Sequence, residues 1–418
     1  MELMRSGQSA AGGGQWAVDS GQDAPGLGQD APDTGPGVAA DRRLPTADLR
    51  VALVHDWLNG MRGGEKVLAA LCERYPDADV FTLFYEPGTV SDTIGRHRII
   101  TSTLQRLPFA RAHYRRYLPL YPTAIEQFNL DAYDLVISSS HCAAKAIIAP
   151  GRARHLCYCH SPMRYAWDQF DAYFGPERVG AVASRWLYRP MLQRLARWDA
   201  ATASRVGRFV ANSQHVAGRI RRYYNREATI VYPPVDTIFY NSDGTPPGRH
   251  FLIVSALVPY KRIDVAIEAC RRVGATLRIA GDGPDRDRLE RLADGHVEFV
   301  GRVSDQQIRD EYRRALAVLL PGEEDFGIVP VEAQACGRPV VALARGGALE
   351  TITPGETGIL FEELTPVSMA GALEAVADAP FDPERLRANA QRFSRERHVE
   401  RMHAVIDETL DAPIGTRW

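Results

Sequence analysis

A chain of 418 residues is longer than one hydrophobic core usually supports, so the length predicts two domains. Hydrophobic residues make up 45% of the chain and charged residues 24%, which is typical of an ordinary globular protein. The 50 basic and 52 acidic residues nearly balance, which argues against nucleic acid as a partner, and no run of about 18 apolar residues could span a bilayer.

Residues 1–48 are predicted to be a disordered tail. They are rich in Gly, Ala, Pro, Gln and Asp and are too polar for the apolar segment of a signal peptide. The six cysteines lie in apolar segments, as reduced core residues do, so we expect a cytoplasmic protein. The string Cys157-Tyr158-Cys159-His160 has no second Cys/His pair at ligand spacing, and we therefore expect no metal site.

Residues 49–240 are predicted to form a first domain of alternating strands and helices. The apolar run 49–55 indicates a strand buried on both faces, and 65–71 has helical spacing. The glycine-rich loop 59–64 between them would let backbone N–H groups approach an anion at the positive end of the helix. It lacks the spacing of a dinucleotide fingerprint, so by itself it is equally typical of a tight turn. Further strands are predicted at 80–84, 135–140, 156–159 and 209–211.

Two segments of this domain, 106–121 and 186–198, interleave arginines with aromatic residues at helical spacing. Such helices could lie on an anionic membrane surface, which would make the protein peripheral on the inner face of the membrane. They could equally cover the core with their apolar faces and leave the arginines in water. Dependence of activity on lipid would separate these two interpretations.

Residues 248–395 are predicted to form a second domain of the same kind, after a polar linker at 241–249. Strands at 251–255, 277–280, 297–300 and 317–320 alternate with helices such as 263–273. This alternation predicts an α/β protein with two Rossmann-like, doubly wound parallel sheets whose ligand-binding edges face each other across a cleft. Residues 396–418 contain a last helix, from about 398 to 410.

The stretch 317–337 carries the acidic residues that are most informative about function. Pro321-Gly322 ends its strand, and a helix can begin at Pro330, which places Glu324 and Asp325 on a loop and Glu332 in the first helical turn. In open α/β sheets ligands bind at this edge. One carboxylate could face a developing positive charge while another accepts hydrogen bonds from hydroxyls. Alternatively, all of them are solvated acids favoured by the helix dipole.

The string E-D-F-G-I-V-P-V-E-A, with Gly346-Gly347 and Glu350-Thr351 downstream, resembles the E-x7-E signature of the retaining glycosyltransferases of family 4, which have the GT-B fold. The resemblance implies that Glu324 lies beside the transferred sugar, that Glu332 holds the nucleotide ribose, and that His160, in an H-S-P string, contacts the sugar. Helix 398–410 would then pack on the first domain. The catalytic residues implied are Glu324 and His160, and the donor-binding residues are Gly63, Gly64, Lys261, Arg262, Gly301, Asp325, Phe326, Gly327, Ile328 and Glu332.

A departing nucleoside diphosphate gains negative charge, which fixed cations or N–H dipoles must stabilise. Lys261, the amides of Gly63 and Gly64, and the helix near Pro330 could do so without a metal or another cofactor. Members of the family usually carry an arginine five residues before the lysine, where this chain has Ala256. We expect Arg262 or Arg62 to supply part of that charge.

The strings V-P-Y-K-R-I-D at 258–264 and H-S-P-M-R at 160–164 resemble a branch that contains many mannosyltransferases. This implies GDP-mannose as donor and a glycan or lipid-linked acceptor, in polysaccharide or glycolipid assembly. Two other classes remain. A non-catalytic nucleotide-sugar-binding subunit is suggested by Ala256, and a Rossmann-type oxidoreductase would need a G-x-G-x-x-G string that does not follow the first strand.

Overall fold

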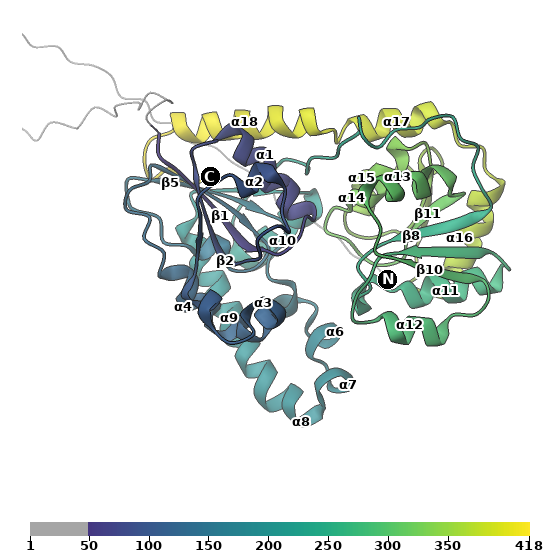
Figure 1. Cartoon of the computed structure of the whole chain (residues 1–418), viewed down its shortest axis with the longest axis horizontal. Helices are drawn as coiled ribbons and strands as arrows, with labels where there is room; N and C mark the ends of the chain where they lie inside the picture. The colour runs from purple at the N-terminus through teal and green to yellow at the C-terminus, as the bar shows by residue number, and fades with distance from the viewer. Residues whose placement is uncertain (1–48) are drawn as a thin grey trace, which may run out of the picture. The chain divides into compact units, whose positions relative to one another are not determined.

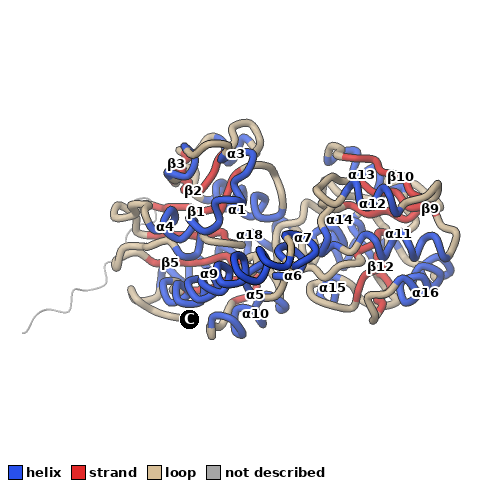
Figure 2. Tube along the Cα trace, turned by 90° about the horizontal axis from the view of Figure 1, so that it is seen from below, coloured by secondary structure: helices blue, strands red, loops and turns tan. Residues whose placement is uncertain are grey.

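Two parallel β-sheets with helices packed against them make up the computed structural model, which describes residues 49–418 (Figures 1 and 2). The tail predicted for residues 1–48 lies outside the described residues. The strands of each sheet follow one another through helical crossovers, as alternating strand and helix patterns require. The prediction of two doubly wound α/β domains is confirmed.

The first sheet has seven strands in the order β3-β2-β1-β4-β5-β6-β7. Its strands are β1 Val51–Leu58, β2 Asp79–Tyr85, β3 Ile99–Thr101, β4 Leu135–Ser140, β5 Arg154–Cys159, β6 Arg208–Ala211 and β7 Thr229–Ile230. Its α-helices are α1 Gly63–Arg74, α2 Asp92–Gly95, α3 Ala110–His113, α4 Tyr121–Glu126, α5 Arg164–Trp167, α6 Phe170–Phe174, α7 Pro176–Val179, α8 Ala181–Ala183, α9 Arg189–Thr202 and α10 Gln214–Tyr224.

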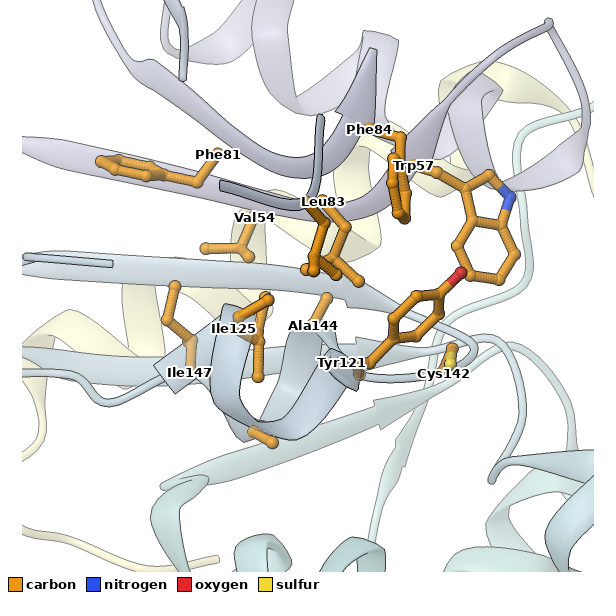
Figure 3. Packing of buried hydrophobic residues seen from close by; sticks show 14 of the residues in the cluster. Val54, Trp57, Phe81, Leu83, Phe84, Tyr121, Ile125, Cys142, Ala144 and Ile147 are labelled. Atoms are coloured by element: carbon orange, nitrogen blue, oxygen red, sulfur yellow. The ribbon is translucent and has the colours of Figure 1, made fainter. Parts of the chain in front are cut away.

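Strand β1 is buried on both faces, which explains its continuous apolar sequence. Ala52 and Val54 point into one core cluster, whereas Val51 and Leu53 point into another on the opposite face. In the first cluster aromatic rings from β1, β2 and α4 pack together near the carboxyl end of β1 (Figure 3). This packing lies beside the carboxyl edge of the sheet, which carries the polar residues described below.

The second sheet has six strands in the order β10-β9-β8-β11-β12-β13. Its strands are β8 His250–Val254, β9 Thr276–Ala280, β10 Val297–Gly301, β11 Ala317–Leu320, β12 Val340–Leu343 and β13 Gly358–Phe361. Its α-helices are α11 Ile263–Arg272, α12 Arg286–Leu292, α13 Asp305–Arg314, α14 Ile328–Ala335, α15 Ala348–Thr351, α16 Pro366–Asp378 and α17 Pro383–Gln391. Strand β11 lies in the interior of this sheet, between β8 and β12, so the acidic loop that follows it leaves from the middle of the edge.

The last helix, α18 Arg395–Asp411, packs on the first sheet (Figure 1). Its apolar residues Met402, Val405 and Ile406 share a core cluster with Val51 and Leu53 of β1. Because the helix begins directly after the second sheet's helices and ends on the first sheet, it links the two halves of residues 49–418, which belong to one compact unit.

Three helix predictions were wrong in detail. Helix α1 begins at Gly63, so Gly63 and Gly64 belong to its first turn and not to the preceding loop. Helix α14 begins at Ile328, two residues before Pro330, and Glu332 lies past the first turn. The segment 106–121 is broken into short pieces, among them η2 Thr103–Arg106 and η3 Tyr114–Leu120, because a proline inside η3 and an exposed Phe109 with positive φ interrupt regular helix.

Two buried histidines predict a loss of stability in acid. Burial lowers the pKa of His155 and that of His398 from 6.5 to about 4. The unfolded chain takes up these protons near its ordinary histidine pKa, so acid favours unfolding between about pH 6.5 and 4. We expect the free energy of unfolding to fall by about 3 kcal/mol per histidine over this range. Urea denaturation as a function of pH measures it. His155→Gln should flatten the slope, and an unchanged slope would contradict the account.

Candidate active site

The loop after β11 is held in place by a pair of glycines. Gly347 N–H donates to the carbonyl oxygen of Glu324 at 2.8 Å, and Glu324 pairs with Gly346 in an isolated β-bridge. Gly346 has φ +61°, and a Cβ there would collide with the backbone of Glu324. Only glycine allows this close approach, and it orients the Glu324 side chain at the edge of the sheet.

Glu324 is in direct contact with Lys261. Lys261 ends the short turn η7 Pro259–Lys261, and its ammonium donates to Glu324 Oε1. Burial and the Arg164 guanidinium lower the pKa of Lys261, while the nearby carboxylates favour its charged form. Two residues predicted to serve the donor sugar and its diphosphate are therefore in direct contact with each other.

Asp325 is the centre of a buried ion-pair network. Arg164 donates to Asp325 Oδ2 at 2.8 Å, and Arg219 donates to Asp325 Oδ1 at 2.9 Å. Burial would raise the pKa of Asp325, but the two guanidinium groups outweigh it and hold the pKa below its usual range. Ser213, the N-cap of α10, also donates to the Asp325 carbonyl oxygen at 2.6 Å. The carboxylate is thus engaged by arginines and is not free to meet a sugar hydroxyl.

Glu332 lies on α14 and is 5% exposed. Lys66 of α1 donates to Glu332 Oε1 at 3.1 Å, and the hydroxyl of Tyr312 donates to Oε2 at 3.0 Å. Burial opposes the charge of Lys66, yet the Glu332 carboxylate outweighs it and raises the pKa of Lys66. Glu332 therefore accepts hydrogen bonds on both of its carboxyl oxygens, and a ribose hydroxyl could take the place of Lys66.

The first turn of α1 has no room for side chains. A Cβ at Gly63 would lie 2.9 Å from Ile328 Cδ1, and one at Gly64 would lie 3.2 Å from His55 Cε1 and 3.5 Å from His160 Nε2. The glycines thus bring the N-terminal amides of a twelve-residue helix close to His160 and Ile328. Free amides at a helix N-terminus favour an anion.

His160 follows β5 at the carboxyl edge of the first sheet. The side-chain amide of Asn212 donates to the carbonyl oxygen of His160 at 3.0 Å, and His160 Nε2 lies 2.8 Å from Ser139 Oγ. Burial, with His141 and His55 nearby, holds the pKa of His160 well below its ordinary value. His160 is therefore a neutral hydrogen-bonding group.

The remaining predicted residues either have their side chains engaged elsewhere or are glycines that the backbone conformation requires. Arg262, with φ +52°, directs its guanidinium to Asp264 at 3.1 and 3.2 Å. Phe326 is 2% exposed and packs on Tyr232 and Phe393, so its ring is part of the core. Gly327 and Gly301 have positive φ, where they begin α14 and end β10 respectively.

Neither arginine expected to replace the missing one at Ala256 approaches Lys261. Arg262 is bound to Asp264, and Arg62 donates to Asn59 Oδ1 at 3.0 Å while its side chain is 56% exposed. The guanidinium whose charge acts on Lys261 is that of Arg164, which also lies over the Tyr260 ring at 5.5 Å. The expectation that Arg262 or Arg62 supplies charge to the diphosphate stays a prediction, and in the structure both guanidinium groups have partners close by in the sequence.

Four residues at the site were not predicted: Lys66, Arg164, Ser213 and Arg219. Arg164 was visible in the H-S-P-M-R string, and Lys66 directly follows the Gly63-Gly64-Glu65 string. For Arg219 the sequence offers no local indication, since its partner Asp325 is 106 residues away. Among the described residues, no group of three or more His, Cys, Asp or Glu side chains could hold a metal ion.

Each half of the chain matches a model of a known protein family. Residues 61–239 match the family model described as Glycosyltransferase Family 4, and residues 243–393 match that described as Glycosyl transferases group 1. These two segments therefore match glycosyltransferase family models, and the chain has the GT-B fold of the solved structures reported below.

Individual relatives cover part of the chain. A D-inositol 3-phosphate glycosyltransferase of Rhodococcus erythropolis is 33% identical over 218 residues, 45% of this chain and 49% of that protein. An uncharacterized glycosyltransferase of Methanocaldococcus jannaschii is 26% identical over 214 residues, 49% of this chain and 60% of that protein. The chain thus matches about half the length of these curated relatives.

Solved structures share the fold over most of the chain. Sucrose-phosphate synthase from Thermosynechococcus elongatus superposes with a TM-score of 0.64 and 18% identity, covering 87% of this chain and 100% of that one. The Anabaena protein HepE in complex with UDP gives a TM-score of 0.61 and 19% identity, covering 86% and 100%. At these identities the likeness establishes the fold alone. Across residues 49–418, no helix combines the length and apolarity needed to cross a membrane.

Proposed function

We propose that the protein is a retaining glycosyltransferase that moves a hexose from a nucleoside diphosphate sugar to a glycan or lipid-linked acceptor. The observation that carries the proposal is the carboxyl edge of the second sheet. There Glu324 with Lys261, and Glu332 with Lys66, present two carboxylates with exchangeable cationic partners. A sugar nucleotide offers ribose hydroxyls to Glu332. It also offers a reacting sugar to Glu324 and a diphosphate to Lys261.

Each residue has a distinct task in this reaction. Glu332 accepts hydrogen bonds from ribose hydroxyls in place of Lys66. Lys261 leaves Glu324 and binds the diphosphate. The N–H dipoles of Gly63 and Gly64 also stabilise the charge of the leaving group. The freed Glu324 carboxylate then faces the positive charge that develops on the sugar. The acceptor attacks from the face that the diphosphate leaves, and the departing phosphate takes the acceptor's proton, so the anomeric configuration is retained.

GDP-mannose is the donor that we propose, from the V-P-Y-K-R-I-D and H-S-P-M-R strings. A UDP-sugar is the second candidate because structures with this fold contain UDP. A thermal-shift screen of GDP-, UDP- and ADP-sugars, followed by assays of product release, tests both. The proposal predicts that one nucleotide class raises the melting temperature and that its sugar is turned over. Stabilisation without turnover would favour a non-catalytic binding subunit instead.

For the acceptor we propose a lipid-linked glycan reached by peripheral contact with the membrane, in envelope polysaccharide or glycolipid assembly. Trp186 and Leu187 of η5 Ser184–Tyr188 are 72% and 59% exposed, beside the arginines Arg185 and Arg189. Exposed apolar side chains among cations suit an anionic lipid surface. Vesicle co-sedimentation tests this: binding should need anionic lipid and fall for Trp186→Ser, and equal binding to zwitterionic vesicles would contradict it.

Glu332→Ala is predicted to weaken binding of the free nucleoside diphosphate by about tenfold, because ribose hydroxyls lose a charged acceptor. Isothermal calorimetry with GDP and UDP measures the change. Lys66→Met serves as the comparison, since it removes the lysine that binds Glu332 but keeps the Glu332 carboxylate. This variant should bind the nucleoside diphosphate with equal or higher affinity than the wild type. Unchanged affinity in Glu332→Ala would exclude the ribose role.

Activity is expected to survive excess chelator, because Lys261 and helix N-terminal amides supply the positive charge for the leaving group. In the Asp-x-Asp string 285–287, which follows β9, Arg288 binds Asp285 at 2.9 and 2.7 Å, so this carboxylate is already engaged. Activity that EDTA abolishes and Mn²⁺ restores would show that a metal takes part.

A further inference from the structure

A serine hydroxyl joins two histidine rings at the carboxyl edge of the first sheet. Ser139 Oγ lies 3.0 Å from His55 Nδ1 and 2.8 Å from His160 Nε2. The three residues come from the adjacent strands β1, β4 and β5, with His55 directly opposite Ser139 in the parallel register. His55 and Ser139 are completely buried, so these contacts are not exchanged with water.

The shared hydroxyl couples the tautomers of the two rings. Ser139 has one proton, so it donates to one histidine and accepts from the other. If Ser139 donates to His55 Nδ1, then His55 carries its proton on Nε2, and His160 donates its own Nε2–H to Ser139. In the reverse arrangement His55 has a bare Nε2, and His160 has its proton on Nδ1.

Glu65 decides between these arrangements. Its Oε1 lies 3.9 Å from His55 Nε2, and its Oε2 accepts the backbone N–H of Arg62 at 3.0 Å. Burial would raise the pKa of Glu65, but the neighbouring His55, the backbone N–H of Glu65 itself and the charge of Arg62 hold it below its ordinary value, so the group is a carboxylate. In a buried setting a carboxylate repels the lone pair of a bare Nε2 and attracts an N–H. The carboxylate 3.9 Å away therefore favours the tautomer of His55 with its proton on Nε2, an atom that is buried and has no hydrogen-bond partner in the structure.

The tautomer of His55 determines the tautomer of His160, because Ser139 binds both rings. With Ser139 donating to His55, His160 keeps its proton on Nε2 and presents the lone pair of Nδ1. Within residues 49–418 no protein group hydrogen-bonds to His160 Nδ1. Gly64, against which His160 Nε2 packs, and Asn212, which binds the His160 carbonyl, fix the position of the ring. The ring is thus set as an acceptor whose partner is missing from the protein itself.

We propose that Glu65, His55 and Ser139 form a positioning chain that sets His160 as a hydrogen-bond acceptor, through Nδ1, for a hydroxyl of the transferred sugar. This inference rests on the proposed function. It deepens that function by assigning Ser139 and His55 a share in donor recognition, and it requires a donor sugar with a hydroxyl, as opposed to a deoxy or acylated position, at the place that His160 reaches.

The same strand provides a matched control. Ser138 is the preceding residue of β4, and its hydroxyl lies 2.9 Å from His155 Nε2. Both serines are buried and both bind a histidine ring, but the side-chain hydrogen bonds of Ser138 and His155 within residues 49–418 go to each other and to the Arg205 carbonyl oxygen, and none goes to His55, His160 or Gly64. Ser138→Ala therefore removes an equivalent buried Ser–His contact without touching the chain that ends at His160.

The test combines ¹⁵N NMR of histidine-labelled protein, with His160→Gln to assign the resonance, and steady-state kinetics of donor hydrolysis. In the wild type His160 should be neutral with its proton on Nε2. Ser139→Ala should give mixed tautomers and lower kcat/KM for the sugar nucleotide about tenfold, the effect of one hydrogen bond, with affinity for free GDP or UDP unchanged. Ser139→Thr, which keeps the hydroxyl, should restore both, and Ser138→Ala should change neither.

A proton on Nδ1 of His160 in the wild type would overturn the proposal, as would equal kinetic losses in Ser139→Ala and Ser138→Ala. Failure of the proposed function looks different: the wild type would turn over no sugar nucleotide, whatever the tautomer. In that case the sugar contact is excluded, while the NMR result still decides whether Glu65 sets the tautomer.

Discussion

Replacing Glu324 by glutamine is expected to lower kcat by about a hundredfold or more while the affinity for nucleoside diphosphate stays near the wild-type value. The amide keeps the shape of the side chain but carries no charge to face the sugar as the glycosidic bond breaks. The hydrogen bond from Gly347 to the Glu324 backbone does not involve the side chain, so the loop should stay in place.

The neighbouring residue supplies the control for this variant. Glu323 lies on the same loop, its side chain is 45% exposed, and it pairs with His215 at 3.3 Å. Glu323→Gln removes one charge at nearly the same place in the sequence and should leave kcat within about twofold, as is usual for an exposed pair. Equal kcat values for the two variants would show that Glu324 has no part in the chemistry.

Lys261→Ala should be the second large loss, about a hundredfold in kcat/KM, because one fixed cation at the leaving group is worth about 3 kcal/mol. Arg262→Ala is the matched comparison and should cost far less, since its guanidinium is engaged by Asp264. Steady-state kinetics with the donor identified by the screen measures both. If Arg262→Ala proved the more damaging, the diphosphate would lie on the other side of the η7 turn from the one assigned here.

The buried strands could be predicted from sequence because their apolar runs are continuous. Strand β4 and strand β11 have the predicted bounds. Helix starts were less predictable. Gly63 and Ile328 are weak helix formers. The two helix starts lie close together, since a Cβ at Gly63 would be 2.9 Å from Ile328 Cδ1, and a sequence does not show such a proximity between residues far apart in the chain.

The candidate site also contains residues that could be predicted from the sequence and residues that could not. Glu324, Lys261 and Glu332 lie in strings that one sequence displays, so they could be named in advance. Their partners could not, because a sequence does not show which charges meet in space. Arg164 is 161 residues from Asp325, and Lys66 is 266 residues from Glu332. The Arg262–Asp264 pair is the opposite case, since the two residues are only two positions apart and the pairing was visible in the sequence.

The central claim is that Glu324 and Glu332 divide the work of one site, with Glu332 binding the nucleotide and Glu324 serving the breaking bond. Release of nucleoside diphosphate from the donor, measured in parallel with calorimetric affinity for that nucleotide, tests this most directly in the two variants. The account predicts that Glu324→Gln loses turnover and keeps affinity, whereas Glu332→Ala loses affinity first. Identical behaviour of the two variants, or turnover retained in Glu324→Gln, would contradict it.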